Sequence, residues 1–234
     1  MIISMVQTKG GTGKSTLAQC LAFSSKFSQA FDAIALVEMD EQKTLHKWWQ
    51  ARQENGRKSQ KVDFYHISTP DQNEIRQNME RVIEDHDLVL IDVPGESVSR
   101  FRTIFACSLS DLILIPMRTS THDEDALENL LPIIVEVLAS NPEKRETFCI
   151  VPAFTHPRTK KQKIAAYFQQ ALPEYIRCLD AVFPLRSVYE NFNREGLTLK
   201  EYGKLVGNNR REYKQVRNAE KDISNIAAAI LRGV

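Results

Sequence analysis

The residues best suited to chemistry lie in the octet Lys-Gly-Gly-Thr-Gly-Lys-Ser-Thr at positions 9–16. An apolar run at 2–6 precedes this octet, and apolar residues at helical spacing follow it. In a strand–turn–helix of this kind, the glycines allow backbone N–H groups to turn inward around phosphate oxygens, and the start of the helix adds its own free N–H groups. Lys14 is placed to reach the β- and γ-phosphates of a nucleotide, and the Ser15 hydroxyl is placed to bind Mg²⁺.

The octet departs from the common phosphate-loop pattern in one informative way. The pattern G-x-x-x-x-G-K-[ST] would place its first glycine at Thr8, whereas this chain has a second lysine, Lys9, before the glycine pair. This is the deviant Walker A form KGGxGK[ST], and on these residues the chain resembles the ParA/MinD family of dimerising ATPases. A glycine turn that binds no nucleotide is the alternative. We predict that ATP is bound by Lys9, Gly10, Gly11, Thr12, Gly13, Lys14, Ser15 and Thr16.

The resemblance gives Lys9 a role beyond its own subunit. In the ParA/MinD family this extra lysine crosses to the phosphates of the other subunit, in a face-to-face dimer that encloses the ATP molecules. Charge that develops in the transition state is then stabilised by a group that is delivered only on dimerisation. The resemblance therefore implies that Lys9 and Lys14 are both catalytic. A solvated loop lysine is the alternative for Lys9.

A second part of the predicted site is the acidic residue at the end of the apolar run 88–93. Asp92 is followed by Pro94 and Gly95, and it would hold Mg²⁺ through water opposite Ser15, as a Walker B carboxylate does. In the resembling family, a turn that contains Pro-Gly follows this strand and senses the γ-phosphate. We predict that Ser15 and Asp92 are the metal-binding residues.

The end of an earlier apolar run, 33–37, carries the candidate for water activation. The corresponding family segment reads D-x-D-P-Q, and its second Asp orients or activates the attacking water. The resemblance maps this role onto Asp40 and implies that Asp40 is catalytic. Glu38 replaces the first Asp of the family segment and Glu41 replaces the Pro, so the chain departs from the family in this loop. An ordinary acidic strand end is the alternative.

Two further segments resemble parts of the family that lie near the base of the nucleotide. Pro116 closes the apolar run 112–116, Arg118 follows it two positions later, and Arg158 follows the run 148–153. The resemblance implies that Pro116 belongs to the nucleotide site and that the two arginines lie near the adenine. A turn proline and surface arginines are the alternatives.

Apolar runs alternate with helical patterns along most of the chain. The run 88–91 is apolar at consecutive positions, which suits a strand covered on both faces. The alternation predicts an α/β fold of three layers, a mostly parallel twisted sheet with helices on both faces, as in the P-loop NTPases. We expect one domain, 1–234, with a helical basic C-terminal segment at about 205–234. Strands are expected at 2–6, 33–37, 62–67, 88–93, 112–116 and 148–153, and helices at about 14–28, 43–55, 72–85, 97–108, 122–139 and 160–171.

The composition restricts the class of protein. The 234 residues are 42% hydrophobic and 26% charged, and the formal net charge of +1 excludes a globally basic nucleic-acid binder. The four cysteines include no C-x-x-C and the five histidines have no ligand spacing, so neither residue type predicts a metal site. The sequence opens on the first core strand, and no apolar run approaches the length of a membrane span. We therefore expect a cytoplasmic protein without stable membrane association.

A basic stripe near the end of the chain is the candidate DNA-binding surface. Four of its members, Arg210, Lys214, Arg217 and Lys221, are spaced three or four residues apart, so on a helix they fall within an arc of about 60°, and Arg211 lies nearby. The resembling family uses C-terminal basic residues to bind nucleoid DNA without sequence specificity, in the ATP dimer only. A solvated helix face is the alternative. The predicted DNA-binding residues are Arg210, Arg211, Lys214, Arg217 and Lys221.

The resemblance implies a ParA-type positioning ATPase. ATP and Mg²⁺ would drive homodimerisation and attachment to the nucleoid, and an adaptor of the ParB kind would stimulate hydrolysis and release a cargo such as a plasmid, a chromosome or a large assembly. One alternative is a MinD-like switch on a membrane surface, for which the last segment has an apolar face of Ile223, Ile226, Ile230 and Leu231. The other is a P-loop small-molecule kinase or synthetase, although no acceptor pocket is recognisable.

Overall fold

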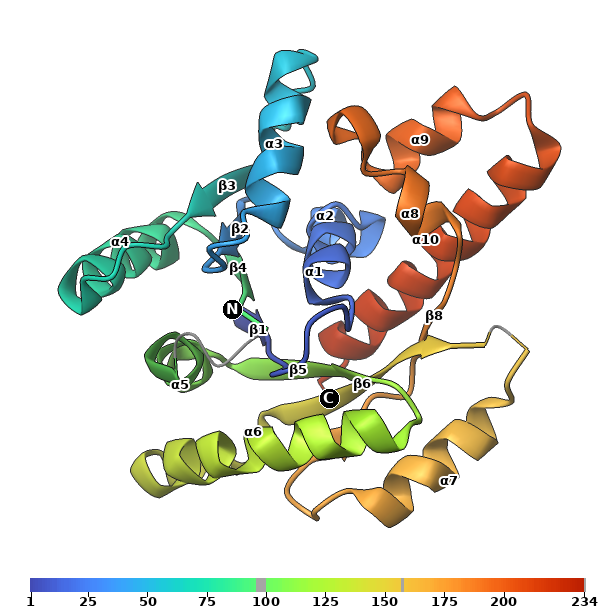
Figure 1. Ribbon diagram of the computed structural model, residues 1–234. Helices are drawn as coiled ribbons and strands as arrows, with labels where there is room; N and C mark the ends of the chain where they lie inside the picture. Colours follow the sequence, from blue (N-terminus) through green and yellow to red (C-terminus); the bar gives the residue numbers. More distant parts are fainter. Residues whose placement is uncertain (96–99, 157, 234) are drawn as a thin grey trace.

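A parallel β-sheet forms the centre of the computed structural model, which describes residues 1–95, 100–156 and 158–233 (Figure 1). The strands follow the order β3-β2-β4-β1-β5-β6-β7, and β8 pairs with β6 beside this path. All of the described strand pairs are parallel. The strands are β1 (Ile2–Met5), β2 (Ile34–Glu38), β3 (Val62–His66), β4 (Leu88–Asp92), β5 (Leu112–Met117), β6 (Phe148–Thr155), β7 (Arg177–Cys178) and β8 (Phe183–Pro184).

Helices cover both faces of the sheet (Figure 1). One apolar core lies beneath α1, α2, α3, α8, α9 and α10, and a second lies beneath α4, α5, α6 and α7. The three-layer α/β fold predicted from the sequence is thereby confirmed. The helices are α1 (Lys14–Ala22), α2 (Ser25–Ala30), α3 (Thr44–Glu54), α4 (Gln72–Asp85), α5 (Arg100–Leu109), α6 (Thr121–Ser140), α7 (Lys161–Ala171), α8 (Val188–Asn191), α9 (Leu199–Leu205) and α10 (Arg210–Leu231), with short 3₁₀ helices η2 (Pro142–Glu146) and η3 (Arg194–Gly196).

Strand β4 shows why its sequence is apolar without alternation. Leu88 and Leu90 belong to the core under α1 and α10, whereas Val89 and Ile91 belong to the core on the other face. Successive side chains of a strand point to opposite faces, so a strand between two helical layers needs an apolar residue at each position. The strand ends at Asp92, which is also buried.

The first predicted helix, 14–28, is two helices in the structure. α1 ends at Ala22, and α2 begins at Ser25. Between them, the Ser24 hydroxyl oxygen accepts a hydrogen bond from the backbone N–H of Phe27 at 3.2 Å and caps the second helix. A serine in this position satisfies a free N–H group at the helix start, and it therefore favours a new helix over continuation of the old one.

Other predicted boundaries differ by a few residues. The helix predicted at 97–108 is observed as Arg100–Leu109, and positions 97–99 lie outside the described residues. The last predicted strand, 148–153, continues to Thr155. Strands β7 and β8 were not predicted, because each has 2 residues and is too short for a periodic pattern.

The basic C-terminal segment packs on the core. Helix α10 buries Val216, Ile223, Ile226 and Ile230 in the same core as α1, and the two helices are in contact. The apolar face that favoured a membrane-surface switch is thus covered by protein, although Leu231 is 40% exposed. Within the described ranges, no helix combines the length and the hydrophobicity that a bilayer span requires.

Candidate nucleotide-binding site

The predicted phosphate loop connects β1 to α1 and leaves the start of α1 open. Gly11 and Gly13 have φ angles of 70° and 89°, in the region that favours glycine. A Cβ atom on Gly13 would also lie 2.7 Å from Cζ of Phe154, so a larger residue would collide there. The first turn of α1 has no side-chain cap, and its backbone N–H groups are therefore available to an anion.

A cavity of about 460 Å³ lies beside this loop. Its walls bring together the loop 10–16, the segment 40–42 and the turn 94–95, which follow β1, β2 and β4. These are the carboxyl ends of neighbouring parallel strands, where open α/β sheets bind their ligands. Two larger cavities of about 670 and 770 Å³ are not lined by the loop glycines, although the larger one adjoins the site at Lys9, Pro94 and Gly95. Size alone therefore does not identify the site, whereas the loop does.

Lys14 is buried at the edge of this cavity. The residue is 7% exposed, and its Nζ lies 3.4 Å from the Lys9 carbonyl oxygen. Burial lowers the pKa of Lys14, and the nearby carboxylates of Asp92 and Asp40 raise it in part. A buried ammonium is stabilised by an anion that comes into contact with it, so this position suits a phosphate group.

Asp92 is a buried carboxylate without a hydrogen-bond partner. The residue is 1% exposed, and neither carboxylate oxygen has a hydrogen-bond partner of normal geometry in the described part of the chain, although the Ser15 hydroxyl lies near enough to favour the charged form. Burial raises the pKa of Asp92 to about 7, although Ser15 and Lys14 act in the opposite direction. A carboxylate and a hydroxyl that face each other provide the oxygen ligands that Mg²⁺ prefers. The residues present therefore fit a divalent cation that is shared with a phosphate.

No protein-only metal cage is present among the described residues. They contain no group of three or more His, Cys, Asp or Glu side chains that could hold a metal ion. This arrangement is compatible with Mg²⁺, which usually keeps several waters and binds through one or two carboxylates together with the phosphates of a substrate.

Glu38 accounts for one departure from the family segment. Its side chain is buried, and its two carboxylate oxygens accept hydrogen bonds from the backbone N–H groups of Leu45 at 2.8 Å and His46 at 3.0 Å. These N–H groups belong to the first turn of α3, where a carboxylate is favourable. Burial raises the pKa of Glu38, and the two hydrogen bonds lower it in part. Glu38 therefore fixes α3 to the end of β2.

Asp40 lies in the loop that follows Glu38, on the wall of the cavity. Its Oδ1 accepts a hydrogen bond from the backbone N–H of Gln42 at 2.9 Å. Glu41, which replaces the usual Pro, forms an ion pair with Arg102 at 3.0 Å. The structure thus places Asp40 beside the phosphate loop, as the proposed role requires, and its catalytic role stays a prediction.

Lys9 is held by a residue that the sequence did not indicate. Its Nζ lies 2.6 Å from Oδ1 of Asp123 at the start of α6, and the side chain of Asp123 is 0% exposed. The other Asp123 oxygen accepts a hydrogen bond from the backbone N–H of Arg118 at 2.6 Å. Lys9 is not among the described residues that line the nucleotide cavity. In the single chain the Lys9 ammonium is thus paired with Asp123, and its contact with a nucleotide stays a prediction.

The three residues predicted to lie near the base of the nucleotide occupy different environments in the structure. Pro116 is buried in β5, and its carbonyl oxygen lies 3.5 Å from Nε2 of Gln7, away from the described cavity wall. The Arg118 guanidinium donates to the Gly11 carbonyl at 3.1 Å and lies 4.7 Å from the centre of the Phe154 ring. Arg158 is exposed. Phe154 lines the cavity beside these residues, and the sequence analysis did not predict it.

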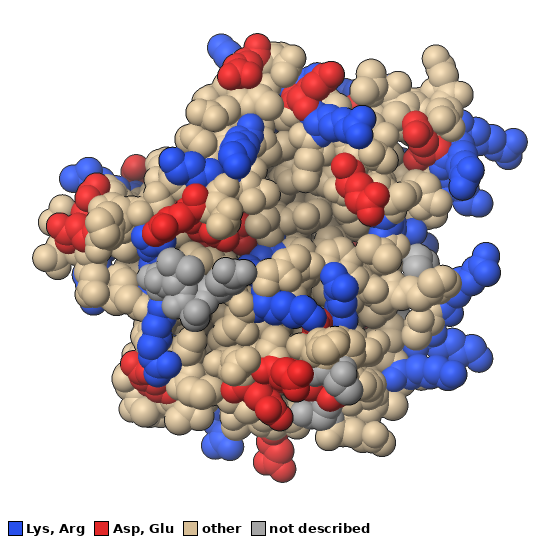
Figure 2. Space-filling view, in the orientation of Figure 1, with Lys and Arg blue, Asp and Glu red and all other residues tan. Residues whose placement is uncertain are grey.

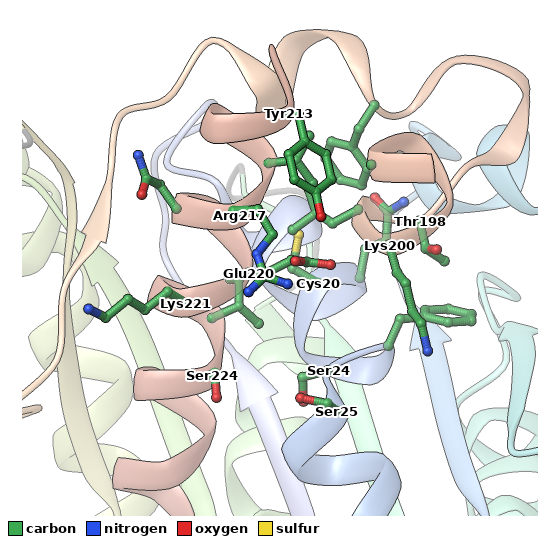
Figure 3. Close-up of a pocket in the computed structure, with 18 residues that line it drawn as sticks. Cys20, Ser24, Ser25, Thr198, Lys200, Tyr213, Arg217, Glu220, Lys221 and Ser224 are labelled. Carbon is green, nitrogen blue, oxygen red and sulfur yellow. The ribbon is translucent and has the colours of Figure 1, made fainter. Parts of the chain in front are cut away.

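The predicted basic stripe lies on a continuous helix, α10. All five of its residues are exposed, and their side chains form no ion pair within the described ranges. Figure 2 shows Lys and Arg gathered along the right margin of the molecule, over the start of α10 and the connection from β6 to α7. Figure 3 shows that Arg217 leans over a neighbouring cavity between α1, α9 and α10, whereas Lys221 points away from its centre. Contact between this stripe and DNA stays a prediction.

Comparison with known families gives a match over the whole chain. The family model described as VirC1 protein matches residues 1–234. A comparison with curated proteins gives no match.

Solved structures share the fold at low sequence identity. A plasmid partition protein of Borrelia burgdorferi B31 bound to AMPPNP aligns with a TM-score of 0.65 and 15% identity, over 100% of this chain and 98% of that one. A McdA–ATP complex from Cyanothece gives 0.64 and 16%, over 98% and 95%. The MinC:MinD complex of Aquifex aeolicus gives 0.68 and 14%, over 100% and 96%. At these identities the likeness shows the fold alone, which is that of the ParA/MinD-type ATPases.

Proposed function

The chain belongs to the VirC1 protein family, and on this premise we propose that it is a ParA-type ATPase. In this proposal it dimerises on ATP, binds DNA without sequence specificity, and positions or partitions a cargo through adaptor-stimulated hydrolysis. The observation that carries the proposal is the cavity where the phosphate loop, Lys14 and Asp40 meet beside the unpaired Asp92. Proteins of the same fold have been solved with AMPPNP and with ATP.

The residues of the cavity have distinct tasks in this proposal. The N–H groups of the loop and Lys14 bind the phosphates, and Ser15 together with Asp92, through water, holds Mg²⁺. Bound Mg²⁺ would neutralise part of the charge on the phosphates. Asp40 orients the attacking water and accepts its proton while the bond from the γ-phosphorus to the bridging oxygen breaks.

Lys9 is the group through which dimerisation would control hydrolysis. In the single chain its ammonium lies against Asp123 at 2.6 Å, with 37% of the side chain exposed. We propose that Lys9 leaves Asp123 when two chains meet face to face, and that it then contacts the phosphates bound by the partner. An isolated chain would therefore hydrolyse ATP slowly, because it lacks this cation at its own cavity.

The exposed cations of α10 support the DNA-binding part of the proposal. Phosphate contacts from Lys and Arg provide most of the non-specific affinity for DNA, and they need no base-reading element. Two copies of α10 in a dimer would present two stripes, and the ATP dimer would bind more tightly than the single chain. The protein would then be associated with the nucleoid while ATP is bound.

An adaptor protein would complete the cycle. The MinD structure with a similar fold was solved with a partner protein, MinC, which supports a partner for this chain without naming one. We propose that the adaptor binds the ATP dimer near its seam, aligns Asp40 with the attacking water, and so returns the protein to single chains.

Size-exclusion chromatography with light scattering tests the dimer. With saturating ATP and Mg²⁺, the Asp40→Ala variant should elute as a two-subunit species, because hydrolysis no longer dissolves the dimer. The Lys9→Ala variant should bind ATP and remain single, and Lys14→Ala should bind no nucleotide. A single-chain Asp40→Ala protein under these conditions would contradict the proposal.

A co-sedimentation assay separates DNA binding from membrane binding. The ATP-bound protein should sediment with DNA and not with anionic liposomes, because the apolar face of α10 is buried in the core. Sedimentation with liposomes alone would favour a membrane-surface switch.

A further inference from the structure

Arg102 contacts the loop that carries Asp40 at the residues before and after Asp40. Its Nη1 donates to the Met39 carbonyl oxygen at 3.2 Å and forms an ion pair with Oε1 of Glu41 at 3.0 Å. Met39 and Glu41 are the residues immediately before and after Asp40. One guanidinium nitrogen therefore contacts the two residues that flank the carboxylate proposed to orient water, through the backbone of Met39 and the side chain of Glu41.

The same side chain also anchors this loop to the neighbouring strand end. Nη2 of Arg102 donates to the carbonyl oxygens of Ser68 at 2.8 Å and Thr69 at 3.3 Å, just beyond β3. Arg102 itself belongs to α5, which follows β4, and it is 4% exposed. The guanidinium thus connects the segments that follow three different strands, β2, β3 and β4, at the wall of the nucleotide cavity.

Glu41 makes the burial of this charge favourable. A buried guanidinium needs both hydrogen-bond acceptors and a counter-charge, and Glu41 supplies the counter-charge while its own side chain stays 59% exposed. In the family segment a Pro occupies this position and restricts φ of the loop. Glutamate imposes no such restriction, so in this chain the order of the loop has to come from outside it.

We infer that Arg102 and Glu41 form a clamp that fixes Asp40 for hydrolysis, and that the clamp takes the place of the rigid Pro. The inference rests on the proposed ATPase function. Both amino groups of Arg102 are engaged by protein oxygens, so Arg102 acts as a positioning residue and is not the group that contacts the phosphates. A carboxylate displaced by about 1 Å can cost roughly 10²-fold in rate.

The exposed end of the clamp allows a test that spares the core. In the full chain, Glu41→Ala should lower kcat for ATP roughly 10- to 100-fold and leave KM within about twofold, because in the proposed site the loop N–H groups and Lys14 hold the phosphates. Glu41→Gln keeps an acceptor for Arg102 and should retain more activity than Glu41→Ala. Glu54→Ala removes a carboxylate at the end of α3 and serves as the matched control, with unchanged kcat.

The buried end of the clamp gives an independent check. Arg102→Lys keeps the charge but cannot form the four contacts, and it should lower kcat at least as much as Glu41→Ala. The double variant should be no slower than Arg102→Lys alone, because the two residues act as one unit. Thermal unfolding of each variant shows whether a loss of activity follows from a loss of fold.

Amide hydrogen exchange keeps this inference separate from the proposed function. In the free protein, Glu41→Ala should speed exchange at 40–43 about tenfold or more, with α3 beyond its first turn unchanged. A wild-type protein without ATPase activity would overturn the proposed function, and the exchange result would still decide the clamp. Unchanged exchange, or wild-type kcat in folded Glu41→Ala and Arg102→Lys, would overturn the clamp.

Discussion

The nucleotide cavity and the junction between α3 and α9 both bury charged side chains, and they compensate these charges in opposite ways. At the junction, Arg52 is 2% exposed and binds both carboxylate oxygens of Glu201, at 2.6 and 3.0 Å. It also donates to the Gly196 carbonyl at 3.0 Å, and its guanidinium lies 5.0 Å from the Phe23 ring and 5.8 Å from the Trp48 ring. Its charge is compensated within the chain.

At the cavity, the buried charges are compensated less completely, because Lys14 and Asp92 attract each other but form no ion pair within the described ranges. Asp92 has no hydrogen-bond partner in the described ranges, and its pKa is raised to about 7 by burial. That shift from 3.8 corresponds to on the order of 4 kcal/mol that disfavours the charged form. By contrast, burial would raise the pKa of Glu201, but hydrogen bonds from Arg52 and Thr198 lower it to about 2.

This difference in charge compensation distinguishes residues that stabilise the fold from residues that bind a ligand. A buried charge whose partner comes from the same chain keeps that partner compensated, so removal of either one destabilises the native state strongly. A buried charge without a partner destabilises the free protein, and this cost is recovered only when an ion or a phosphate binds. Such groups mark functional sites, and this contrast leads to five predictions.

Removal of the lysine at the cavity should have the largest effect. Lys14→Ala should reduce ATP hydrolysis by about 10³-fold or more, because the phosphates lose their buried cation. The free protein should unfold at nearly the same temperature, because removal of the burial cost of this ammonium offsets its lost attraction to Asp92 and Asp40. Isothermal titration with AMPPNP and differential scanning fluorimetry measure both quantities. Retained nucleotide affinity in Lys14→Ala would show that Lys14 does not bind the phosphates.

Removal of the arginine at the junction should act on the fold. Arg52→Ala should lower the free energy of unfolding by about 3 kcal/mol, because it leaves Glu201 unpaired and removes packing on two aromatic rings. Urea denaturation followed by circular dichroism measures this change. Arg57→Ala is the matched control: its pair with Glu195, at 3.8 Å, is more exposed and should contribute less than about 1 kcal/mol.

Acid should weaken the junction through Glu201. The pKa of Glu201 is about 2 in the folded protein and 4.5 for the unperturbed group, so its stabilising contribution is present above pH 4.5 and is lost as the pH falls toward 2. Glu201→Gln should remove this part of the pH dependence. Unfolding curves at pH 5, 4 and 3 for both proteins make the comparison, and parallel losses in the two would argue against a stabilising Glu201.

Neutralisation of the unpaired carboxylate should stabilise the free protein. Asp92→Asn should raise the free energy of unfolding by roughly 1–2 kcal/mol without ligand, because it removes a charge whose burial cost exceeds the favourable effects of Ser15 and Lys14. The same change should abolish the gain in melting temperature that ATP and Mg²⁺ give to the wild type. Asp85→Asn, at an exposed helix end, controls for loss of charge. A destabilised Asp92→Asn protein would show that Asp92 is structural.

Reversal of the exposed cations on α10 should have the smallest effect on stability. Arg217→Glu combined with Lys221→Glu should change the free energy of unfolding by less than about 0.5 kcal/mol, since both side chains are exposed. DNA affinity of the ATP dimer should fall, and the log–log salt slope should become shallower by about 1.8 per protomer. Fluorescence anisotropy with labelled duplex DNA at several salt concentrations tests this. Unchanged DNA affinity would contradict a DNA-binding role for the basic stripe.

Local sequence patterns predicted most of the strands and helices and the position of the phosphate loop. The consecutive apolar residues of β4 indicated a strand between two layers, and the glycine spacing of the octet placed a phosphate loop between β1 and α1. Both signals are short-range, since they arise from side-chain alternation and from the backbone freedom of glycine. The break at Ser24 was missed because a single cap interrupted an otherwise helical pattern.

Contacts between segments far apart in the chain could not be predicted from the sequence. Lys9 and Asp123 are separated by 114 positions, and Arg102 reaches Met39 across 63. Neither pair has a periodic signal, because each depends on how α5 and α6 pack against the ends of β1 and β2. Phe154 was missed for the same reason, although its positive φ of 49° marks it as unusual once the backbone is known.

The sequence by itself determined the α/β alternation, the phosphate loop and the identity of the acidic residues at the strand ends, because these features depend on neighbours along the chain. Only the tertiary structure decided which charges are paired. It joined Arg52 to Glu201 and Arg102 to the loop of Asp40, and it left Asp92 without a partner. Pairing depends on burial and on distances across the fold, and those are fixed when the layers pack together.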